Sequence, residues 1–510
     1  IHERLVGSEM CIRDRYNTII LYVRIIVCSG LSLWTIPLAL SALGQSDFGL
    51  YNLIAGVLSM LAFVSSSMAI ASQRYISVSI GSHDVTRINM AYNISLRLHF
   101  LLAIFVIILF EIVYPFLFNG MLNIQPERIK TAQLLYQIMM ISTVSTIVSV
   151  PFDSIMFAHE NMVVPSLIAI LDAINKLVVV VFISTLDIDR LLIYGIGLTF
   201  ITLLNVFLKY LFVKFKYRQY YFSIDSFDKS LFQEMFAYAG WSSVGSLSQL
   251  GRNQGVALVL NFFCGTVVNA AYGIANQINA VLLSFTGSIQ TAISPQLMQR
   301  EGAKDRKGML SMSLVLIKIS TTIFNLIAVP LILEMPYILN IWLKDVPENT
   351  ISFARLILLF QLLYQYSSGI ALSIDAVGKI KEYRLAVSSA LLLNIPLIYI
   401  LLKASVQIRF VLLTFTFVEC ICLCVRIYFA KKKVEYDVKY FITKLMIPSL
   451  LIIIVASFTC FFINKFVCEG VERLIFTTII SCSIILIGSF FFVLTKEERT
   501  YVLNRINSII

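Results

Sequence analysis

The chain has 510 residues, of which 58% are hydrophobic and only 14% are charged, and its formal net charge is +11. This composition excludes a soluble globular domain. Apolar stretches of roughly 20 residues, the length that a membrane-crossing helix needs, follow one another along the whole sequence. We therefore predict an all-α integral membrane protein with about 14 transmembrane helices.

The predicted spans are taken here in chain order. The first six lie at residues 16–43, 48–71, 98–118, 132–157, 164–184 and 191–213. Eight more lie at residues 233–262, 267–293, 309–333, 351–374, 383–402, 407–430, 443–463 and 472–494. Residues 1–15 are expected to be a non-native segment, because Ser8 to Arg15 looks like translated adapter sequence.

A faint internal repeat divides the spans into two lobes. Gly44 and Tyr51 are matched by Gly265 and Tyr272 at an offset of about 221 residues. An even number of helices in each copy keeps both copies in the same orientation, so we predict two pseudo-repeated lobes around a central cavity. The expected limits are 16–213 for helices 1–6, 214–232 for a cytoplasmic linker, 233–430 for helices 7–12, and 431–510 for helices 13 and 14 with a cytoplasmic tail.

The orientation in the membrane follows from the basic residues. Loops on one side hold about 23 Lys and Arg against about 8 on the other, and positively charged loops stay in the cytoplasm. This distribution places 214–229, 300–307, 379–384 and 431–444 in the cytoplasm, together with both termini. Most of the net charge is therefore a topological signal, and no nucleic-acid partner is expected.

Several cations lie where hydrocarbon disfavours them, so they are expected to face a cavity or a partner. Arg252 stands in a polar stripe with Gln249 and Asn253, and Tyr272 and Asn276 repeat at helical spacing in the following span. These residues are predicted to bind an anionic substrate. Polar contacts between helices are the alternative for the amides.

The other buried cations have a local alternative. Arg24 either faces the cavity or reaches the cytoplasmic surface, and Lys176 either binds substrate or pairs with Asp172 one turn away. Lys318 and Arg355 lie closer to the helix ends and are expected to extend to the interface.

Two acidic residues, Glu419 and Asp172, lie deep enough in their spans to couple transport to protons or cations. The four histidines are scattered without the spacing of metal ligands. No cofactor, no metal site and no catalytic residue are therefore predicted.

The chain also resembles a known family on several segments. They are Gly44, Asp47 to Asn52, Ala71 to Ser77, Tyr238 to Trp241, Gln254 to Gly255, Val268 to Ala275, Gln290 to Gln296, Tyr337 to Leu343 and Gly378 to Lys381. On these segments the sequence is similar to the polysaccharide and lipid-linked oligosaccharide flippases, O-antigen flippases among them, of the multidrug/oligosaccharidyl-lipid/polysaccharide exporter superfamily. The resemblance covers nearly all of the chain from Asn17 to Arg499.

The resemblance implies a flippase that moves an undecaprenyl-diphosphate-linked oligosaccharide across the bacterial cytoplasmic membrane by alternating access. It also implies that Arg24 and Arg252, on the first helix of each lobe, hold the diphosphate. The expected partners are the lipid-linked substrate, membrane lipids, and polysaccharide polymerases or glycosyltransferases.

Two alternatives remain open. A multidrug exporter of the same superfamily needs carboxylates in its cavity, and the first helix has none. A membrane enzyme would need a sizeable outer loop or a metal-binding pair of aspartates, so an enzyme is not expected.

Overall fold

In the part of the chain that it describes, the computed structural model contains helices and no strands, which confirms the predicted fold class. The described residues are 2–59, 62–118, 124–185, 189–223, 227–343 and 345–507. The side chains of residues 1–16, 18, 59, 62, 501, 502 and 505–510 lie outside this description, so the expected non-native segment is described by its backbone alone.

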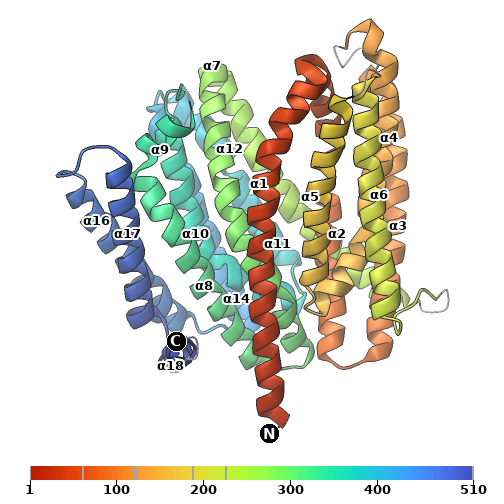
Figure 1. Cartoon of the computed structure of the whole chain (residues 1–510). Helices are drawn as coiled ribbons and strands as arrows, with labels where there is room; N and C mark the ends of the chain where they lie inside the picture. The colour runs from red at the N-terminus through yellow and green to blue at the C-terminus, as the bar shows by residue number, and fades with distance from the viewer. Residues whose placement is uncertain are drawn as a thin grey trace. The chain divides into compact units, whose positions relative to one another are not determined.

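The chain forms two compact units (Figure 1), Ile1–Ser246 with Met298–Lys304 and Leu247–Leu297 with Asp305–Ile510. In the first unit, α1 packs against α5, and α4 packs against α2, α3 and α6. The helices of this unit are α1 (His2–Ser59), α2 (Ala62–Gly81), α3 (Val85–Phe116), η2 (Pro126–Arg128), α4 (Ile129–Ala158), α5 (Val163–Ser184), α6 (Arg190–Lys216) and the two ends of α7 (Lys229–Gly302).

In the second unit, α10 packs against α8 and α14, and α16 and α17 pack against each other and against α8. This unit holds the middle of α7 and the elements α8 (Arg306–Leu333), α9 (Met335–Trp342), α10 (Thr350–Val377), α11 (Lys381–Leu392), α12 (Asn394–Lys403), α13 (Ile408–Val411), α14 (Leu413–Val434), α15 (Val438–Tyr440), η3 (Phe441–Met446), α16 (Ile447–Ile463), α17 (Val471–Gly488), η4 (Ser489–Val493) and α18 (Lys496–Asn507).

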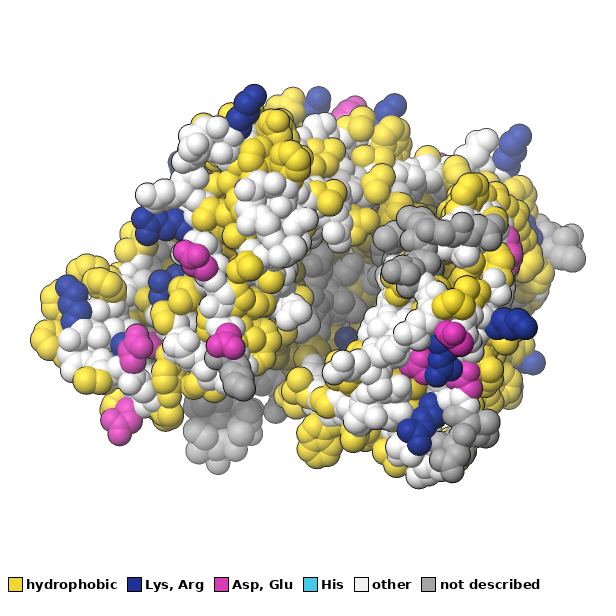
Figure 2. Space-filling model, turned by 90° about the horizontal axis from the view of Figure 1, so that it is seen from above, with side chains coloured by type: hydrophobic (Ala, Val, Ile, Leu, Met, Phe, Trp, Pro, Cys, Tyr) yellow, Lys and Arg dark blue, Asp and Glu magenta, His cyan; other side chains and the backbone are white. Residues whose placement is uncertain are grey.

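Twelve helices of the described chain are long and apolar enough to cross a membrane, so this is a multi-pass membrane protein. Two of the twelve, α1 and α7, each contain a residue with a non-helical backbone, Gly44 and Gly265. The breaks fall where the sequence separates the first span from the second and the seventh from the eighth. Division at these glycines accounts for the larger number of spans that the sequence predicts. Figure 2 shows many hydrophobic side chains at the surface, between small groups of acidic and basic ones.

The two interruptions of the helix have the same geometry, because both glycines adopt nearly the same backbone conformation. Gly44 has φ 79° and ψ 165°, and Gly265 has φ 79° and ψ −174°. A side chain would strain this backbone, whereas glycine adopts it freely.

The offset of 221 residues continues along the chain beyond the two glycines. It relates the starts of α3 and α8, at Val85 and Arg306, and those of α4 and α10, at Ile129 and Thr350. The structure therefore contains the predicted repeat, whereas the expected lobe limits remain a prediction.

One expectation about the cations was wrong. The Lys318 side chain does not reach the interface but is buried in α8, where its ammonium forms an ion pair with Glu498 of α18 at 2.7 Å. Arg355 is half-buried, and its Nε donates to the carbonyl oxygen of Ile332 at 2.8 Å, near the end of α8, so its extension to the interface stays a prediction. A carboxylate distant in sequence therefore balances the charge of Lys318 within the protein.

Candidate functional site

Three ionisable side chains are buried together in the second unit. Arg252 of α7 is 6% exposed, Glu419 of α14 is 1% exposed, and Arg426 of α14 is 4% exposed. Burial of an ionised group in a membrane domain costs free energy unless partners compensate for the lost hydration. Their neighbours therefore define what this cluster can do.

Arg252 is held mainly by aromatic rings. Its guanidinium carbon lies 5.3 Å from the ring centre of Phe360 on α10 and 5.1 Å from that of Phe415 on α14. Its Nε donates a hydrogen bond to Oδ1 of Asn253 at 3.1 Å. Within the described part of the chain, this guanidinium has no carboxylate within ion-pair distance. Cation–π contacts stabilise the cation but leave its positive charge uncompensated.

Glu419 is already paired. Its Oε1 lies 2.5 Å from Nη1 of Arg426, and the same nitrogen donates to Oγ of Ser367 at 3.0 Å. The guanidinium of Arg426 also lies 5.3 Å from the ring centre of Tyr364. Its Nε is buried without a hydrogen-bond partner among the described residues.

The cluster carries an excess of positive charge, because Arg252 and Arg426 stand against the single carboxylate of Glu419. A cation in a medium of low dielectric constant attracts an anion far more strongly than it does in water. Arginine also presents a planar fork of donors that matches the oxygens of a phosphate. The cluster is therefore suited to bind an anionic group.

The other residues predicted around Arg252 fall into two sets. The Tyr272 ring packs against Phe415, with ring centres 6.4 Å apart, and Asn253 contacts Arg252 directly. The Gln249 side chain is exposed, and Nδ2 of Asn276 donates to the backbone oxygen of Tyr272 at 2.9 Å. The structure thus brings Asn253 and Tyr272 to the cluster and leaves the amide of Asn276 bonded to its own helix.

A second group of charges lies in the first unit. Nζ of Lys176 lies 2.7 Å from Oδ2 of Asp172, so the local ion pair considered for these two residues is present. Nδ2 of Asn205, on α6, donates to the same carboxylate at 2.8 Å. The half-buried Arg24 of α1 and this pair all lie within electrostatic reach of the Cys28 thiol. This group also has two cations and one carboxylate.

The first unit also contains a neutral pocket of about 450 Å³ among α1, α2, α4 and α6. Tyr51 and the hydroxyl side chains of Ser142 and Thr146 are part of its lining. The Tyr51 ring packs against Tyr194, with ring centres 5.0 Å apart. Among the described residues that line the pocket, tyrosine is the only ionisable type.

Sequence reasoning missed Arg426, Phe360 and Phe415. Arg426 lies five residues before the basic run that begins at Lys431, so it resembled a residue of the cytoplasmic boundary. The sequence signal for Arg426 was its spacing from Glu419. Seven residues make about two helical turns, so both side chains lie on one face of the helix.

Comparison with known proteins places this geometry in a known fold. Residues 25–182 match the MatE family model. Sequence comparison with curated proteins finds no match.

Three solved structures illustrate the similarity, and in each case the match covers 83% of this chain and 96% of the other. An outward-facing multidrug resistance MATE family transporter of the MOP superfamily is 15% identical, with a TM-score of 0.70. A MATE protein in the straight conformation is 16% identical, with a TM-score of 0.71. A MOP superfamily transporter from Pyrococcus furiosus Vc1 (DSM3638), described as having a binding pocket of reverse polarity that suggests a different function, is 16% identical, with a TM-score of 0.69. The chain has the fold of the MATE transporters.

Proposed function

We propose that the protein is a transporter of the bacterial cytoplasmic membrane that works by alternating access. The MATE fold supports this proposal, because solved proteins of that fold are described as transporters. We also propose that both termini are cytoplasmic, which rests on the distribution of Lys and Arg between the loops.

The proposed substrate is an undecaprenyl-diphosphate-linked oligosaccharide, which the protein would move from one leaflet to the other. The observation that carries this proposal is the buried Arg252, whose charge is met by aromatic rings and one amide rather than by a carboxylate. The residues proposed to bind the diphosphate head group of the substrate are Arg252, Asn253, Gln249, Tyr272 and Asn276 in the second unit. In the first unit they are Arg24 and Lys176. A few cations bind the anion and still permit its release.

The two carboxylates are proposed to couple transport to protons. Glu419 forms an ion pair with Arg426, and Asp172 forms an ion pair with Lys176. Protonation of either carboxylate would release its cation to bind the substrate, and loss of the proton would restore the ion pair and favour release. Polysaccharide polymerases and glycosyltransferases are the proposed partners, because they would use or supply the same lipid-linked substrate.

A multidrug exporter is the second candidate, and the comparisons favour it. The MatE match and the similarity to a multidrug resistance transporter support this candidate more directly than they support a flippase. The buried carboxylate of Glu419 would serve such an exporter as the site for a proton or an organic cation.

Transport by the purified protein in liposomes distinguishes the two candidates. We would measure the movement of a fluorescent undecaprenyl-diphosphate oligosaccharide and, in parallel, of a cationic dye. We expect the lipid-linked oligosaccharide to cross and the dye to be excluded. Movement of the dye alone would reject the flippase and establish the drug exporter.

A further inference from the structure

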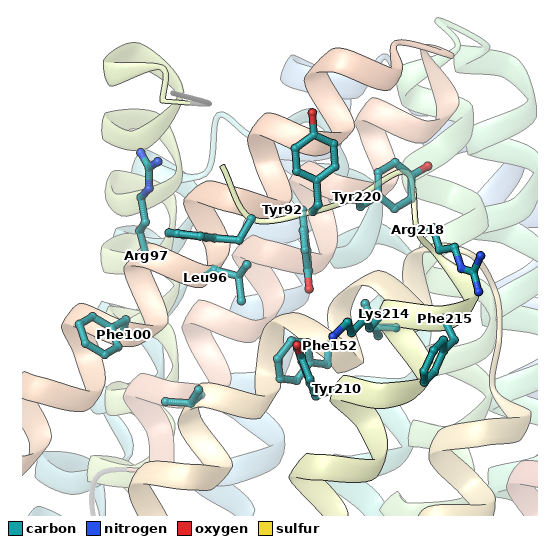
Figure 3. Close-up of a pocket in the computed structure, with 14 residues that line it drawn as sticks. Tyr92, Leu96, Arg97, Phe100, Phe152, Tyr210, Lys214, Phe215, Arg218 and Tyr220 are labelled. Atoms are coloured by element: carbon teal, nitrogen blue, oxygen red, sulfur yellow. The ribbon is translucent and has the colours of Figure 1, made fainter. Parts of the chain in front are cut away.

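The first unit also contains a groove of about 830 Å³, and no residue of either charged cluster is part of its lining. It is formed by α3, α4, α6 and the segment 217–223 that follows α6. Figure 3 shows side chains from all four of these elements around it. Neither the resemblance to flippases nor the proposed transport mechanism makes use of this groove.

Three basic side chains line the groove, namely Arg97, Lys214 and Arg218, and none of the described residues in its lining is a carboxylate. In the view of Figure 3, Lys214 lies between the other two. Nη2 of Arg97 donates to the backbone oxygen of Ser223 at 2.9 Å, which joins α3 to the segment after α6. Lys214 and Arg218 are exposed, and within the described residues neither forms an ion pair.

The rest of the lining is mainly aromatic, and much of it is exposed. Phe100 is 60% exposed, Phe215 is 61% exposed and Tyr221 is 63% exposed. Exposed aromatic side chains next to lysine and arginine are typical of the boundary between hydrocarbon and lipid head groups.

On both α3 and α6, the residues that line the groove lie where an apolar run meets a basic residue. The apolar run of α3 begins immediately after Arg97, and the apolar run of α6 ends immediately before Lys214. Beyond Phe100, α3 exposes Ile104 and Ile108, which continue an apolar face into the span. A molecule in the groove would therefore have its charged end among the cations and its apolar end along α3.

We propose that this groove binds an anionic phospholipid of the surrounding bilayer. Its phosphate lies among Arg97, Lys214 and Arg218, and its acyl chains lie along the face of α3 that begins at Phe100. The choice of a lipid rests on the apolar face that continues into the membrane. The choice of an anionic head group rests on the three cations of the lining, of which Lys214 and Arg218 are exposed and form no ion pair with a described residue. Each basic residue near a membrane surface contributes roughly a fivefold preference for anionic lipid.

Native mass spectrometry of the delipidated full chain tests this assignment. The protein is titrated with phosphatidylglycerol and, separately, with phosphatidylcholine of the same acyl chains. We expect phosphatidylglycerol to bind at least about tenfold more tightly. The triple variant Arg97→Gln, Lys214→Gln, Arg218→Gln should lose this preference. The charge-retaining double variant Arg97→Lys, Arg218→Lys should keep most of it.

The matched control is the triple variant Lys216→Gln, Lys307→Gln, Lys431→Gln, which removes the same charge from exposed positions outside the groove lining. It should bind phosphatidylglycerol as the wild type does. Equal loss in both triple variants would show a non-specific charge effect and overturn the assignment.

Two competition experiments test the occupant. Inorganic phosphate should fail to displace phosphatidylglycerol, because it lacks the apolar part. Tighter binding of undecaprenyl diphosphate, with no preference for phosphatidylglycerol over phosphatidylcholine, would overturn the phospholipid assignment in favour of a substrate entry site. Neither experiment depends on transport, so the result is independent of the proposed function.

Discussion

The two units share one backbone plan but place their charges differently. The ring pair of Tyr51 and Tyr194 in the first unit recurs at the offset of 221 residues as Tyr272 and Phe415 in the second. The three charged residues of the second cluster have uncharged equivalents at this offset. Arg252, Glu419 and Arg426 correspond to Leu31, Leu198 and Asn205.

The converse also holds for the charges of the first unit. Asp172 and Lys176 correspond to Leu393 and Leu397 of the second unit, and Arg24 corresponds to Gly245. Each of the two charged clusters therefore has two cations and one carboxylate, at positions that are not equivalent. The helix packing and the glycine breaks have been kept between the copies, whereas the charges have changed.

The largest expected effect is the loss of transport when Arg252 is substituted. Substitution to alanine should reduce transport of the undecaprenyl-diphosphate oligosaccharide by about 100-fold, because an anion loses charge-assisted hydrogen bonds. Arg252→Lys should retain part of the activity. Arg409→Ala, which removes an exposed arginine in the same unit, is the control for loss of charge. Wild-type transport by the Arg252→Ala protein would remove this residue from the site.

The next largest expected effect is on stability. The substitutions that test it replace charged residues of the second unit with the residues at the equivalent positions of the first. The substitution Arg426→Asn alone should destabilise the protein by about 3 to 5 kcal/mol, because it leaves the buried Glu419 without its partner. The double variant Glu419→Leu, Arg426→Asn has the residues of the first unit and should recover most of this loss. Thermal unfolding in detergent measures both variants. Equal destabilisation by the single and double variants would contradict the comparison.

The two glycines should respond alike if the units share their backbone. Gly44→Ala and Gly265→Ala should each cost about 2 kcal/mol, because alanine is strained at a φ of 79°. Among the described residues, no atom outside the local backbone lies within 4 Å of the added Cβ at either site, so the expected cost is the strain of the backbone. Gly273→Ala, in regular helix with similar free space, should be neutral or slightly stabilising. A large difference between the two positive-φ variants would show that the breaks are not equivalent.

The smallest expected effect is at α18 and depends on pH. Burial tends to raise the pKa of the Glu498 carboxyl, but hydrogen bonds from Lys318 and from the backbone of Thr495 hold that pKa below its usual value. The ionised Glu498 carboxylate therefore stabilises the folded protein fully above the unfolded-state pKa, about 4.3. This stabilisation is lost as the pH falls through the lower native pKa. Glu498→Gln should cost about 1.5 kcal/mol at neutral pH. The difference from wild type should shrink below about pH 4, and a constant difference would exclude an ionised carboxylate as its source.

The sequence predicted the helices and their repeat because both depend on local patterns. Apolar length locates each span, and the spacing of Gly44 and Gly265 identifies the two copies. It did not predict the partners of the charges. Lys318 was expected at the interface, but its carboxylate is supplied by Glu498, 180 residues later in the chain. Arg252 was recognised from its polar neighbours, whereas Phe360 and Phe415, which contact its guanidinium, resemble ordinary lipid-facing residues until the helices are assembled.

The contact between α8 and α18 also matters for the design of fusion proteins. Thr495 and Glu498 form a capping box at the start of α18, since the backbone N–H of Thr495 donates to Glu498 at 2.8 Å and that of Glu498 donates to Thr495 at 3.3 Å. This arrangement holds the carboxylate at the buried Lys318 ammonium. A reporter or affinity tag joined before residue 498 would leave that ammonium inside the membrane domain without its partner. A tag joined after α18 would preserve the ion pair and should give the higher yield of folded protein.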